Sequence, residues 1–458
     1  MASFTLTDSP DTLTGTGGAD TFTGDAGTLQ TADTITGGGG MDVLTAGVEQ
    51  NGAQSPTIEG VERLFLDTGG LPFDISNIVG ADLIFTDGAS IVLEGVGSAA
   101  LDTVFGGRKV ESGTVKIQFE DGALSASDDR LNLSAVDSNV TFTSDSTFDS
   151  TPDFEDNPTE DRLRVEEIRL VLRGAENQVD ISDFSAIEKL FLVGGADSKI
   201  SLDAPDLERI IANGMTGDLT LTNDIEGDQF VVLGTGSDDV KTGSGADTID
   251  AGRGDDTITA GGGDNKILGR DGNDSITAEA GNDTVFGGSG DDFMSTGSGD
   301  DSVNGAAGND EIVAGDGADN IRGGFGDDDI LGQGGADTIR DGFGADTVDG
   351  GGDDDLLIAG GGDDLLTGGG GVDEFRFRDD FGTDEVTDFT LTSSTSTNDI
   401  VSFEFEGGVV TLQSQAEFEQ FDADNDAALD FDTNTDTVTI FADGGTIVLN
   451  VSDADFLA

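Results

Sequence analysis

The longest uninterrupted pattern in this chain is a nine-residue repeat that runs from Leu233 to Arg376, sixteen units without an inserted or deleted residue. The fourth position is Gly in fifteen units, with Asp353 as the exception, and the sixth is Asp in fifteen, with Asn265 as the exception. The eighth position is apolar in all sixteen. A Gly at a fixed place indicates a tight turn, and one apolar residue at the centre of three indicates a very short strand whose middle side chain points inward.

Such a strand cannot bury its apolar side chain alone, so the repeat predicts a β-solenoid in which stacked units form one continuous apolar ladder. Stacking also places the sixth-position carboxylates in rows at roughly 4.8 Å spacing, where like charges repel. A hard divalent cation held by carboxylate and carbonyl oxygens removes this repulsion. Calcium accepts the irregular coordination by six to eight oxygens that magnesium does not. We therefore predict an all-β, calcium-bound solenoid.

The repeat resembles the G-G-x-G-x-D-x-U-x nonapeptide of the RTX (repeats-in-toxin) proteins, as in residues 287–295 (GGSGDDFMS) and 323–331 (GGFGDDDIL). The resemblance covers about a third of the chain. It implies a parallel β-roll in which two consecutive repeats make one coil, with calcium between the turns at both edges. It also implies export by a type I secretion system and folding outside the cell. Asn265 should weaken the ions that it would share, and Asp353 should distort one turn.

A shorter piece of the same repeat lies near the N-terminus. Asp11 and Asp20 are nine residues apart, and after a four-residue phase shift Asp33 and Asp42 are again nine apart. This predicts a short calcium-dependent coil within residues 1–50, although a flexible Gly/Thr-rich arm is the alternative. The predicted calcium ligands are Asp11, Asp20, Asp33, Asp42, Asp238, Asp247, Asp256, Asp274, Asp283, Asp292, Asp301, Asp310, Asp319, Asp328, Asp337, Asp346, Asp355, Asp364 and Asp373.

Composition restricts the possible partners and chemistry. The net charge is −74, so nucleic acid and a bare anionic membrane are poor partners without a bridging cation. There is no Cys and no His, which removes disulfides, the commonest zinc ligand and the usual base of nucleophilic catalysis. We expect no membrane insertion, because no stretch approaches 18 apolar residues, and no cleavable signal peptide, because the N-terminus lacks a basic start and an apolar core.

Residues 51–232 predict a second, less regular β-solenoid with longer coils. Short strands at 82–86, 90–93, 115–119, 168–172 and 218–221 are separated by turn residues. Residues 58–66 (IEGVERLFL) are echoed by residues 184–192 (FSAIEKLFL), and an acidic surface loop at 143–160 divides the two halves. This region resembles parts of self-assembling bacterial surface-layer (S-layer) proteins that carry RTX repeats, because residues 55–62 (SPTIEGVE) are similar to their I-E-N-V-E phrase. That resemblance implies binding to surface polysaccharide but identifies no binding residue.

Residues 377–458 predict a β-rich C-terminal domain. Residues 383–389 (TDEVTDF) look like the segment that closes many RTX blocks, and the tail 451–458 (VSDADFLA) resembles the uncleaved type I export signal. Residues 422–426 have carboxylates at alternate positions, but the following residues lack the Gly and Glu of an EF-hand loop, which favours a solvated loop.

These observations favour a non-enzymatic structural protein of the bacterial cell exterior that folds and self-assembles with calcium. The expected partners are further copies of the chain in a lattice or filament, surface polysaccharide through calcium bridges, and the type I secretion machinery. A secreted adhesin is the alternative. A secreted hydrolase acting on polysaccharide is less favoured, because the chain has no G-x-S-x-G or H-E-x-x-H motif. Mixed outward residues in the repeats argue against ice binding.

Overall fold

The structure is a computed structural model that describes most of residues 2–47, 56–144, 167–378, 382–390, 398–413 and 429–450, with short gaps inside these ranges. Between residues 67 and 144 it describes the strands chiefly by their backbone. The fold is all-β, a parallel β-solenoid, and the chain divides into two compact units, Met1–Val240 and Lys241–Ala458. Among the described residues, no helix is long and apolar enough to span a bilayer.

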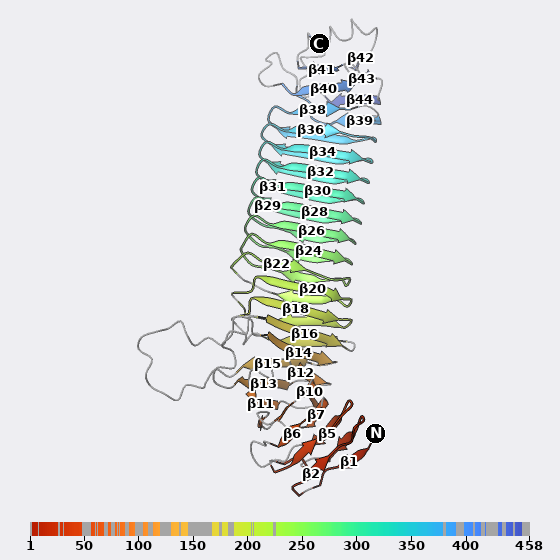
Figure 1. The fold of residues 1–458 in the computed structure, drawn as a ribbon. Coiled ribbons are helices and arrows are strands. Elements are labelled where there is room, and N and C mark those ends of the chain that lie inside the picture. The colour runs from red at the N-terminus through yellow and green to blue at the C-terminus, as the bar shows by residue number, and fades with distance from the viewer. Residues whose placement is uncertain are drawn as a thin grey trace, which may run out of the picture. The chain divides into compact units, whose positions relative to one another are not determined.

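The second unit contains most of the nonapeptide block, and its coils are drawn as stacked pairs of strands in Figure 1. Parallel partners are 18 residues apart, as in Thr284 paired with Ser302 and Phe293 paired with Glu311. Two repeats therefore make one coil, as predicted. One sheet contains β24 (Thr248–Arg253), β26 (Lys266–Asp271), β28 (Thr284–Ser289), β30 (Ser302–Ala307), β32 (Asn320–Phe325), β34 (Thr338–Phe343), β36 (Leu356–Ala359) and β38 (Glu374–Phe377). The other contains β25 (Thr257–Thr259), β27 (Ser275–Thr277), β29 (Phe293–Ser298), β31 (Glu311–Asp316), β33 (Asp329–Gly334), β35 (Thr347–Gly352) and β37 (Leu365–Gly370).

The three-residue strand predicted for each repeat is wrong for most of this block. Strands such as β28 have six residues and continue through the first three positions of the next repeat. The reason is a second inward position, the first of each repeat, where Ala251, Ala278 and Ala314 are fully buried. The second position then takes a left-handed backbone, as at Gly288 (φ 129°), and lets the strand reach the turn.

The core of the block is the ladder predicted at the eighth position, and this prediction is confirmed. All sixteen side chains, from Val240 to Phe375, are at most 1% exposed. Asp353 adopts a left-handed backbone (φ 75°) like the glycines at equivalent positions, so the turn keeps its conformation at an energetic cost instead of rearranging.

The first unit is made of longer and less regular coils, as predicted. Successive partners are 22, 20 and 21 residues apart, as Glu167, Lys189, Arg209 and Phe230 pair in turn. One parallel sheet contains β1 (Ser3–Thr5), β3 (Thr21–Thr23), β5 (Val43–Gly47), β7 (Arg63–Asp67), β10 (Leu83–Asp87), β12 (Val104–Arg108), β14 (Arg130–Val136), β16 (Glu167–Arg173), β18 (Lys189–Gly194), β20 (Arg209–Met215) and β22 (Phe230–Val232). A second contains β8 (Pro72–Asp74), β11 (Ile91–Val96), β13 (Gly113–Phe119), β15 (Asn139–Ser144), β17 (Glu176–Asp180), β19 (Asp197–Ser201) and β21 (Leu219–Thr222). A third contains β2 (Thr12–Thr14), β4 (Thr34–Thr36), β6 (Thr57–Glu59) and β9 (Ile78–Val79), and β23 (Asp239–Lys241) lies at the division between the units.

Two sequence predictions for the first unit can be compared with these strands. The echoed segments occupy equivalent strands, because Leu64 and Leu66 of β7 and Leu190 and Leu192 of β18 are the buried residues of one sheet. The N-terminal repeat forms strands β1 to β5, so this segment is not a flexible arm. Most of the predicted acidic loop at 143–160, the loop at 422–426 and the tail 451–458 lie outside the described residues.

The C-terminal part of the second unit adds strands to both sheets. β40 (Ile400–Phe405) pairs with β38 in parallel and then with β41 (Gly408–Leu412) in antiparallel fashion. On the other sheet β39 (Gly382–Val386) pairs with β37 and β44 (Gly445–Asn450), followed by β43 (Thr437–Ala442) and β42 (Leu429–Asp432). The change to antiparallel pairing ends the coil repeat.

Candidate metal-binding turns

The sixth-position aspartates form two rows, one along each set of turns. In each row the backbone N–H of one aspartate donates to Oδ1 of the aspartate 18 residues later. The bond from Asp274 to Asp292 is 2.8 Å, and the bond from Asp292 to Asp310 is 2.9 Å. In the other row, Asp283 donates to Asp301 over 2.7 Å. Stacking of coils therefore fixes one oxygen of each carboxylate and orients the other.

The second oxygen, Oδ2, is buried and has no hydrogen-bond partner in every sixth-position aspartate from Asp274 to Asp364. These side chains are between 1% and 3% exposed. A buried carboxylate oxygen without a donor costs several kcal/mol unless a cation or a proton neutralises it. The repetition of one unsatisfied oxygen in successive turns indicates a repeated ligand.

The turn that contains Asn265 indicates what surrounds the Oδ2 position of the sixth-position aspartates. Its Oδ1 accepts the N–H of Asp247 at 3.0 Å, as an aspartate Oδ1 would. Its Nδ2, which replaces Oδ2, donates to the carbonyl oxygen of Gly263 at 2.9 Å. In this turn the amide supplies the positive partner that the carbonyl requires. An aspartate presents an oxygen at the equivalent atom, so carboxylate and carbonyl oxygens face each other around a position that suits a hard cation such as calcium.

The electrostatics of the rows agree with this interpretation. Burial raises the pKa of Asp292, Asp319 and Asp328 to about 7, although the N–H bond from the preceding coil lowers it, and neighbouring row aspartates raise it further. In Asp283 and Asp337 the same burial raises the pKa to about 6. At neutral pH, with no cation bound, these rows are therefore poorly compatible with full ionisation.

Four predicted ligands differ from the rest, because backbone N–H groups already bond their second oxygen. The N–H of Thr7 donates to Oδ2 of Asp11 at 2.6 Å, and the N–H of Gln30 donates to Oδ2 of Asp33 at 2.7 Å. Thr16 donates to Asp20 in the same way, and bonds from Ala2 and Thr16 lower the pKa of Asp20. Asp238 accepts a longer bond of 3.4 Å from Gly234.

The remaining predicted ligands make the same kind of bond between an N–H and a side-chain oxygen of neighbouring coils. Asp42 accepts the N–H of Asp20 at 2.7 Å, Asp256 donates to Asp274 at 2.9 Å, and Asp373 accepts the N–H of Asp355 at 3.0 Å. Asp247 donates to Asn265. Second oxygens without a partner thus recur through the long repeat block from Asp274 onward, whereas three of the four N-terminal aspartates have protein donors.

Sequence reasoning missed two aspartates that continue the rows beyond the repeat. Asp384 accepts the N–H of Asp364 at 3.1 Å, and Asp399 accepts the N–H of Asp373 at 3.1 Å. Each stands two residues before a buried valine, Val386 or Val401, which is the spacing of the sixth and eighth positions. They lie 20 and 26 residues after the aspartates that donate to them, so the 18-residue spacing of the coils does not predict them.

A second ladder at the fifth position was also missed. Here the side-chain oxygen accepts from the coil that follows, as when Asn273 donates its N–H to Asp255 at 2.8 Å and Asp291 donates to Asn273 at 3.0 Å. The sequence alternates Asp and Asn along this exposed row, through Asn309 to Asp327. The alternation lowers the charge along this exposed ladder.

One side chain at an outward position of the block is buried. Leu356, Ile358 and Leu365 flank eighth positions, so the alternation of side chains along a strand predicts that they face outward, but Ile358 is only 3% exposed. Parallel pairing places it between Arg340 and Arg376, whose long side chains flank it on the sheet. Leu365 is exposed at 39%, as expected.

Among the described residues of the second unit, the most exposed large apolar side chains are at third positions of the repeat. Phe325 and Phe343, on neighbouring strands β32 and β34, are 62% and 61% exposed. Their rings stack with centroids 5.2 Å apart.

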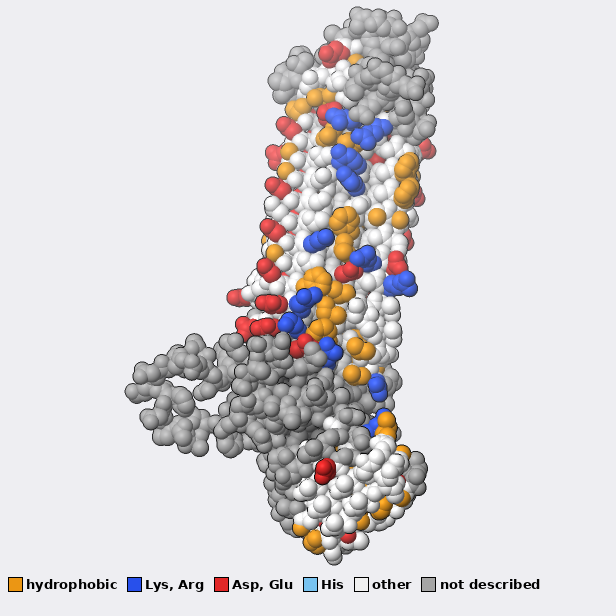
Figure 2. Space-filling view, in the orientation of Figure 1, with side chains coloured by type: hydrophobic (Ala, Val, Ile, Leu, Met, Phe, Trp, Pro, Cys, Tyr) orange, Lys and Arg blue, Asp and Glu red, His pale blue; other side chains and the backbone are white. Residues whose placement is uncertain are grey.

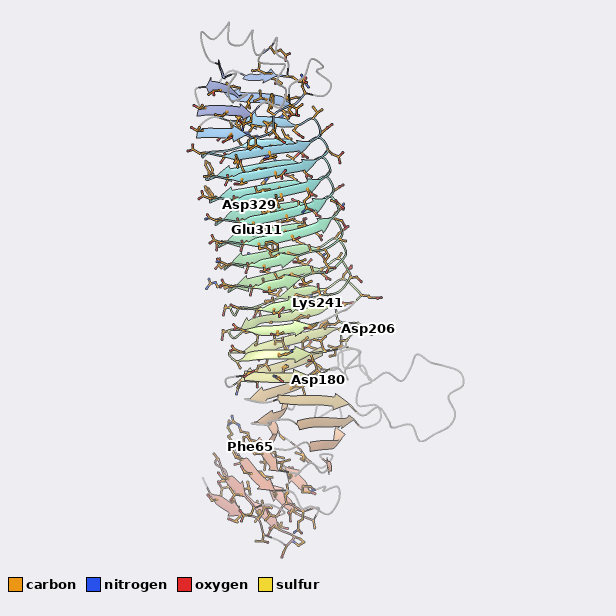
Figure 3. All side chains as sticks on the ribbon, turned by 180° about the vertical axis from the view of Figure 1, so that it is seen from behind. Phe65, Asp180, Asp206, Lys241, Glu311 and Asp329 are labelled. Carbon is orange, nitrogen blue, oxygen red and sulfur yellow. The ribbon has the colours of Figure 1, made fainter. Side chains whose placement is uncertain are left out.

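The two outward faces of the block differ in charge. On the face of β32 and β34, Arg322 and Arg340 are adjacent in register. Burial lowers the pKa of Arg340, and the nearby positive charges lower it further. In its upper part, Figure 2 shows basic and apolar side chains in the middle of this face and acidic ones along its edge. On the opposite sheet Glu311 and Asp329 are paired and exposed, and Figure 3 labels both.

Comparison with known families gives one result. The sequence matches the family described as RTX calcium-binding nonapeptide repeat (4 copies), at residues 7–28, 30–50, 232–267, 259–294, 268–303, 304–339 and 340–375. Both the N-terminal fragment and the long block are therefore included. No curated protein matches the chain.

Proposed function

Because this chain is an RTX calcium-binding repeat protein, we propose that it is a secreted structural protein that folds on meeting calcium outside the cell and then assembles into an extracellular layer or filament. The observation that supports calcium-controlled folding is the series of buried, unpartnered carboxylate oxygens from Asp274 to Asp364. Inside a cell, where free calcium is scarce, this block would remain unfolded. A chain in that state suits passage through a secretion channel.

Calcium control is tested by circular dichroism of the whole protein. In a chelator at neutral pH the β signal of the repeat block should disappear, and millimolar calcium should restore it cooperatively. Magnesium should restore it poorly, because it requires tighter octahedral coordination. A β signal that is unchanged by chelation would refute this part of the proposal.

The export route is proposed from the family and from the C-terminal sequence. Deleting about the last 60 residues should trap the protein inside the cell, and fusing them to a passenger should export the passenger. Secretion that survives the deletion would remove the type I assignment.

Self-assembly is proposed from the unlike faces of the roll. One sheet presents Arg322 and Arg340 beside the stacked pair Phe325 and Phe343, and the opposite sheet presents Glu311 and Asp329. A basic, partly aromatic face and an acidic face on opposite sides are complementary to each other. A contact between opposite faces is heterologous and does not close on two copies, so it favours an open array.

A charge reversal tests this contact. The double variant R322E/R340E should lose assembly in negative-stain images, and adding E311R and D329R to it should restore assembly, because the charges are then exchanged between the two faces. Calcium-induced folding by circular dichroism should remain in both variants. Unchanged assembly in the double variant would exclude these faces as the contact.

The alternative is an adhesin that binds surface polysaccharide through calcium. Binding of the folded, unassembled double variant to purified cell-surface polysaccharide, reversed by a chelator, would favour the adhesin. Release of reducing ends from that polysaccharide would instead indicate the less favoured hydrolase.

A further inference from the structure

Asp341 breaks the pattern of the first repeat position, which elsewhere in the block holds Gly, Ala, Thr or Leu. The side chain at this position points into the turn. At Gly323, for example, an added Cβ would touch Oδ2 of Asp328 in the same repeat. An acid at this position therefore reaches the carboxylate row, and Asp341 is only 1% exposed.

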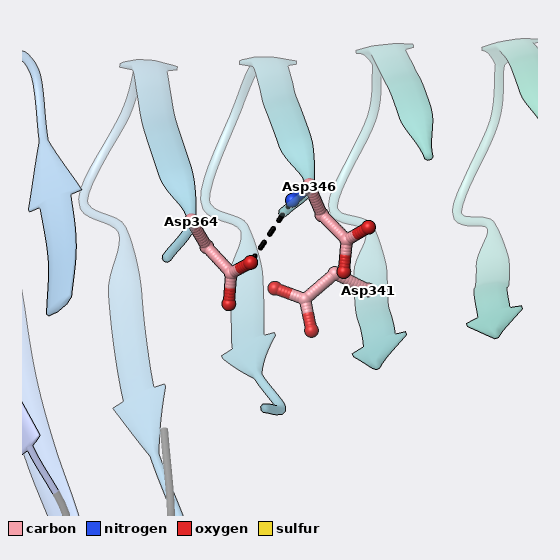
Figure 4. Close-up of side chains that lie close together, drawn as sticks. All are labelled: Asp341, Asp346 and Asp364. Carbon is pink, nitrogen blue, oxygen red and sulfur yellow. Dashed lines mark hydrogen bonds between the residues drawn. The ribbon is translucent and has the colours of Figure 1, made fainter. Parts of the chain in front are cut away.

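Asp341 brings a third carboxylate to one turn, as Figure 4 shows. Its Oδ1 accepts the N–H groups of Gly342 at 2.6 Å and Gly360 at 2.7 Å, while its Oδ2 has no hydrogen-bond partner. Oδ2 of Asp346 and Oδ2 of Asp364 also lack partners, and the N–H of Asp346 donates to Oδ1 of Asp364 at 3.0 Å. One carboxylate oxygen from each of the three lies within 4.8 Å of the others.

This spacing can be compared with cation sizes. Oxygens that share one calcium at 2.3–2.6 Å can be up to about 5 Å apart, whereas those that share one magnesium at 2.0–2.1 Å can be up to about 4 Å apart. The cluster lies within the calcium limit. The two N–H bonds to Oδ1 fix the orientation of the Asp341 carboxylate and leave its second oxygen available as a ligand.

We propose that Asp341, Asp346 and Asp364 together bind one calcium ion more tightly than the other turns of the roll do. This adds a ligand to the calcium-dependent folding proposed above and rests on it. The physical reason is charge, because calcium affinity increases with the number of carboxylates in a site. One ion should therefore remain bound when free calcium falls too low to occupy the other turns.

The test is a calcium titration of the full-length protein in competition with a chromophoric chelator. The wild type should show one ion with roughly tenfold or higher affinity than the remaining ions. Asp341→Gly restores the residue found in neighbouring repeats and should remove that tight ion only, while the other ions still drive folding. Magnesium alone should not occupy the tight site.

The variant Asp341→Asn distinguishes two roles for Asp341, that of a calcium ligand and that of a purely structural residue. The amide keeps an oxygen for the two N–H groups and offers a donor to Asp346 and Asp364, so it should lose the tight ion. If Asp341 is only a protonated structural residue, both variants will keep the wild-type calcium affinities, which overturns the proposal. If neither the wild type nor the variants bind calcium at all, the proposed calcium-dependent folding fails instead.

Discussion

Replacing Asn265 with Asp converts the one amide turn of the block into an ordinary carboxylate turn. The change removes the 2.9 Å bond from Nδ2 to Gly263, worth about 1 kcal/mol. It also adds a buried carboxylate. The neighbouring Asp283 has a pKa of about 6 against an ordinary 3.8, a difference that corresponds to roughly 3 kcal/mol at neutral pH. The calcium-free fold should therefore lose about 4 kcal/mol.

Calcium should reverse this loss, because N265D gains a binding position. One extra ion contributes about 4 kcal/mol when free calcium is roughly a thousand times its dissociation constant. Plots of Tm against the logarithm of free calcium should therefore cross, with N265D lower at limiting calcium and equal or higher at saturation. Thermal melting followed by circular dichroism, at a series of buffered calcium concentrations, measures both slopes.

Two variants control for charge and position. Asp283→Asn, in the next coil of the same row, should flatten the calcium dependence. Asn282→Asp adds the same charge as N265D at an exposed fifth position and should leave the slope unchanged. If N265D gives a line parallel to the wild type, the second oxygen of the sixth position does not bind calcium and the reasoning is wrong.

Three further predictions concern pH, backbone strain and packing. The row carboxylates have folded-state pKa values raised to about 6 or 7, so the calcium-free fold binds more protons than the unfolded chain between about pH 4 and 7. Its stability should therefore fall as pH rises through this window, and circular dichroism in a chelator should show more β structure at pH 4.5 than at pH 7.5; the opposite order would contradict the pKa argument. Asp353→Gly relieves a left-handed non-glycine backbone (φ 75°) and should raise stability by about 1 kcal/mol in denaturant titrations with saturating calcium. Ile330→Ala should cost about 2–5 kcal/mol in the same titration, because it empties a fully buried position, whereas Thr347→Ala on the exposed face should change it by less than about 0.5 kcal/mol.

Most of the fold could be predicted from the sequence, because the repeat imposes the same local choices sixteen times. The inward ladder from Val240 to Phe375, the two-repeat coil and the longer coils of the first unit all follow from the spacing of apolar and turn residues. The six-residue strands could not be predicted, because the first position is mostly Gly or Ala, whose small side chains give little apolar signal. The burial of Ile358 depends on Arg340 and Arg376, which lie beside it only across strands.

The candidate site was predictable in composition but not in detail. The sequence shows an aspartate at every sixth position, but it does not show which second oxygens have donors. Asp20 and Asp292 have the same local motif, yet Thr16 bonds the former, while the latter has an unpartnered oxygen. Asp341 was overlooked because the consensus gives its position no role, and Asp384 because the coil that contains it is two residues longer.

The 18-residue register has a consequence for how such a protein can change in length. Removing or duplicating two repeats shifts every later strand by one whole coil, so each outward column, including Arg322 and Arg340, stays on its own sheet. Removing a single repeat would keep every turn acceptable but move all later strands to the opposite sheet, which would join the basic column to the acidic one. The core tolerates both changes equally. Only the surface distinguishes them, so variation in the length of this block should occur in even numbers of repeats.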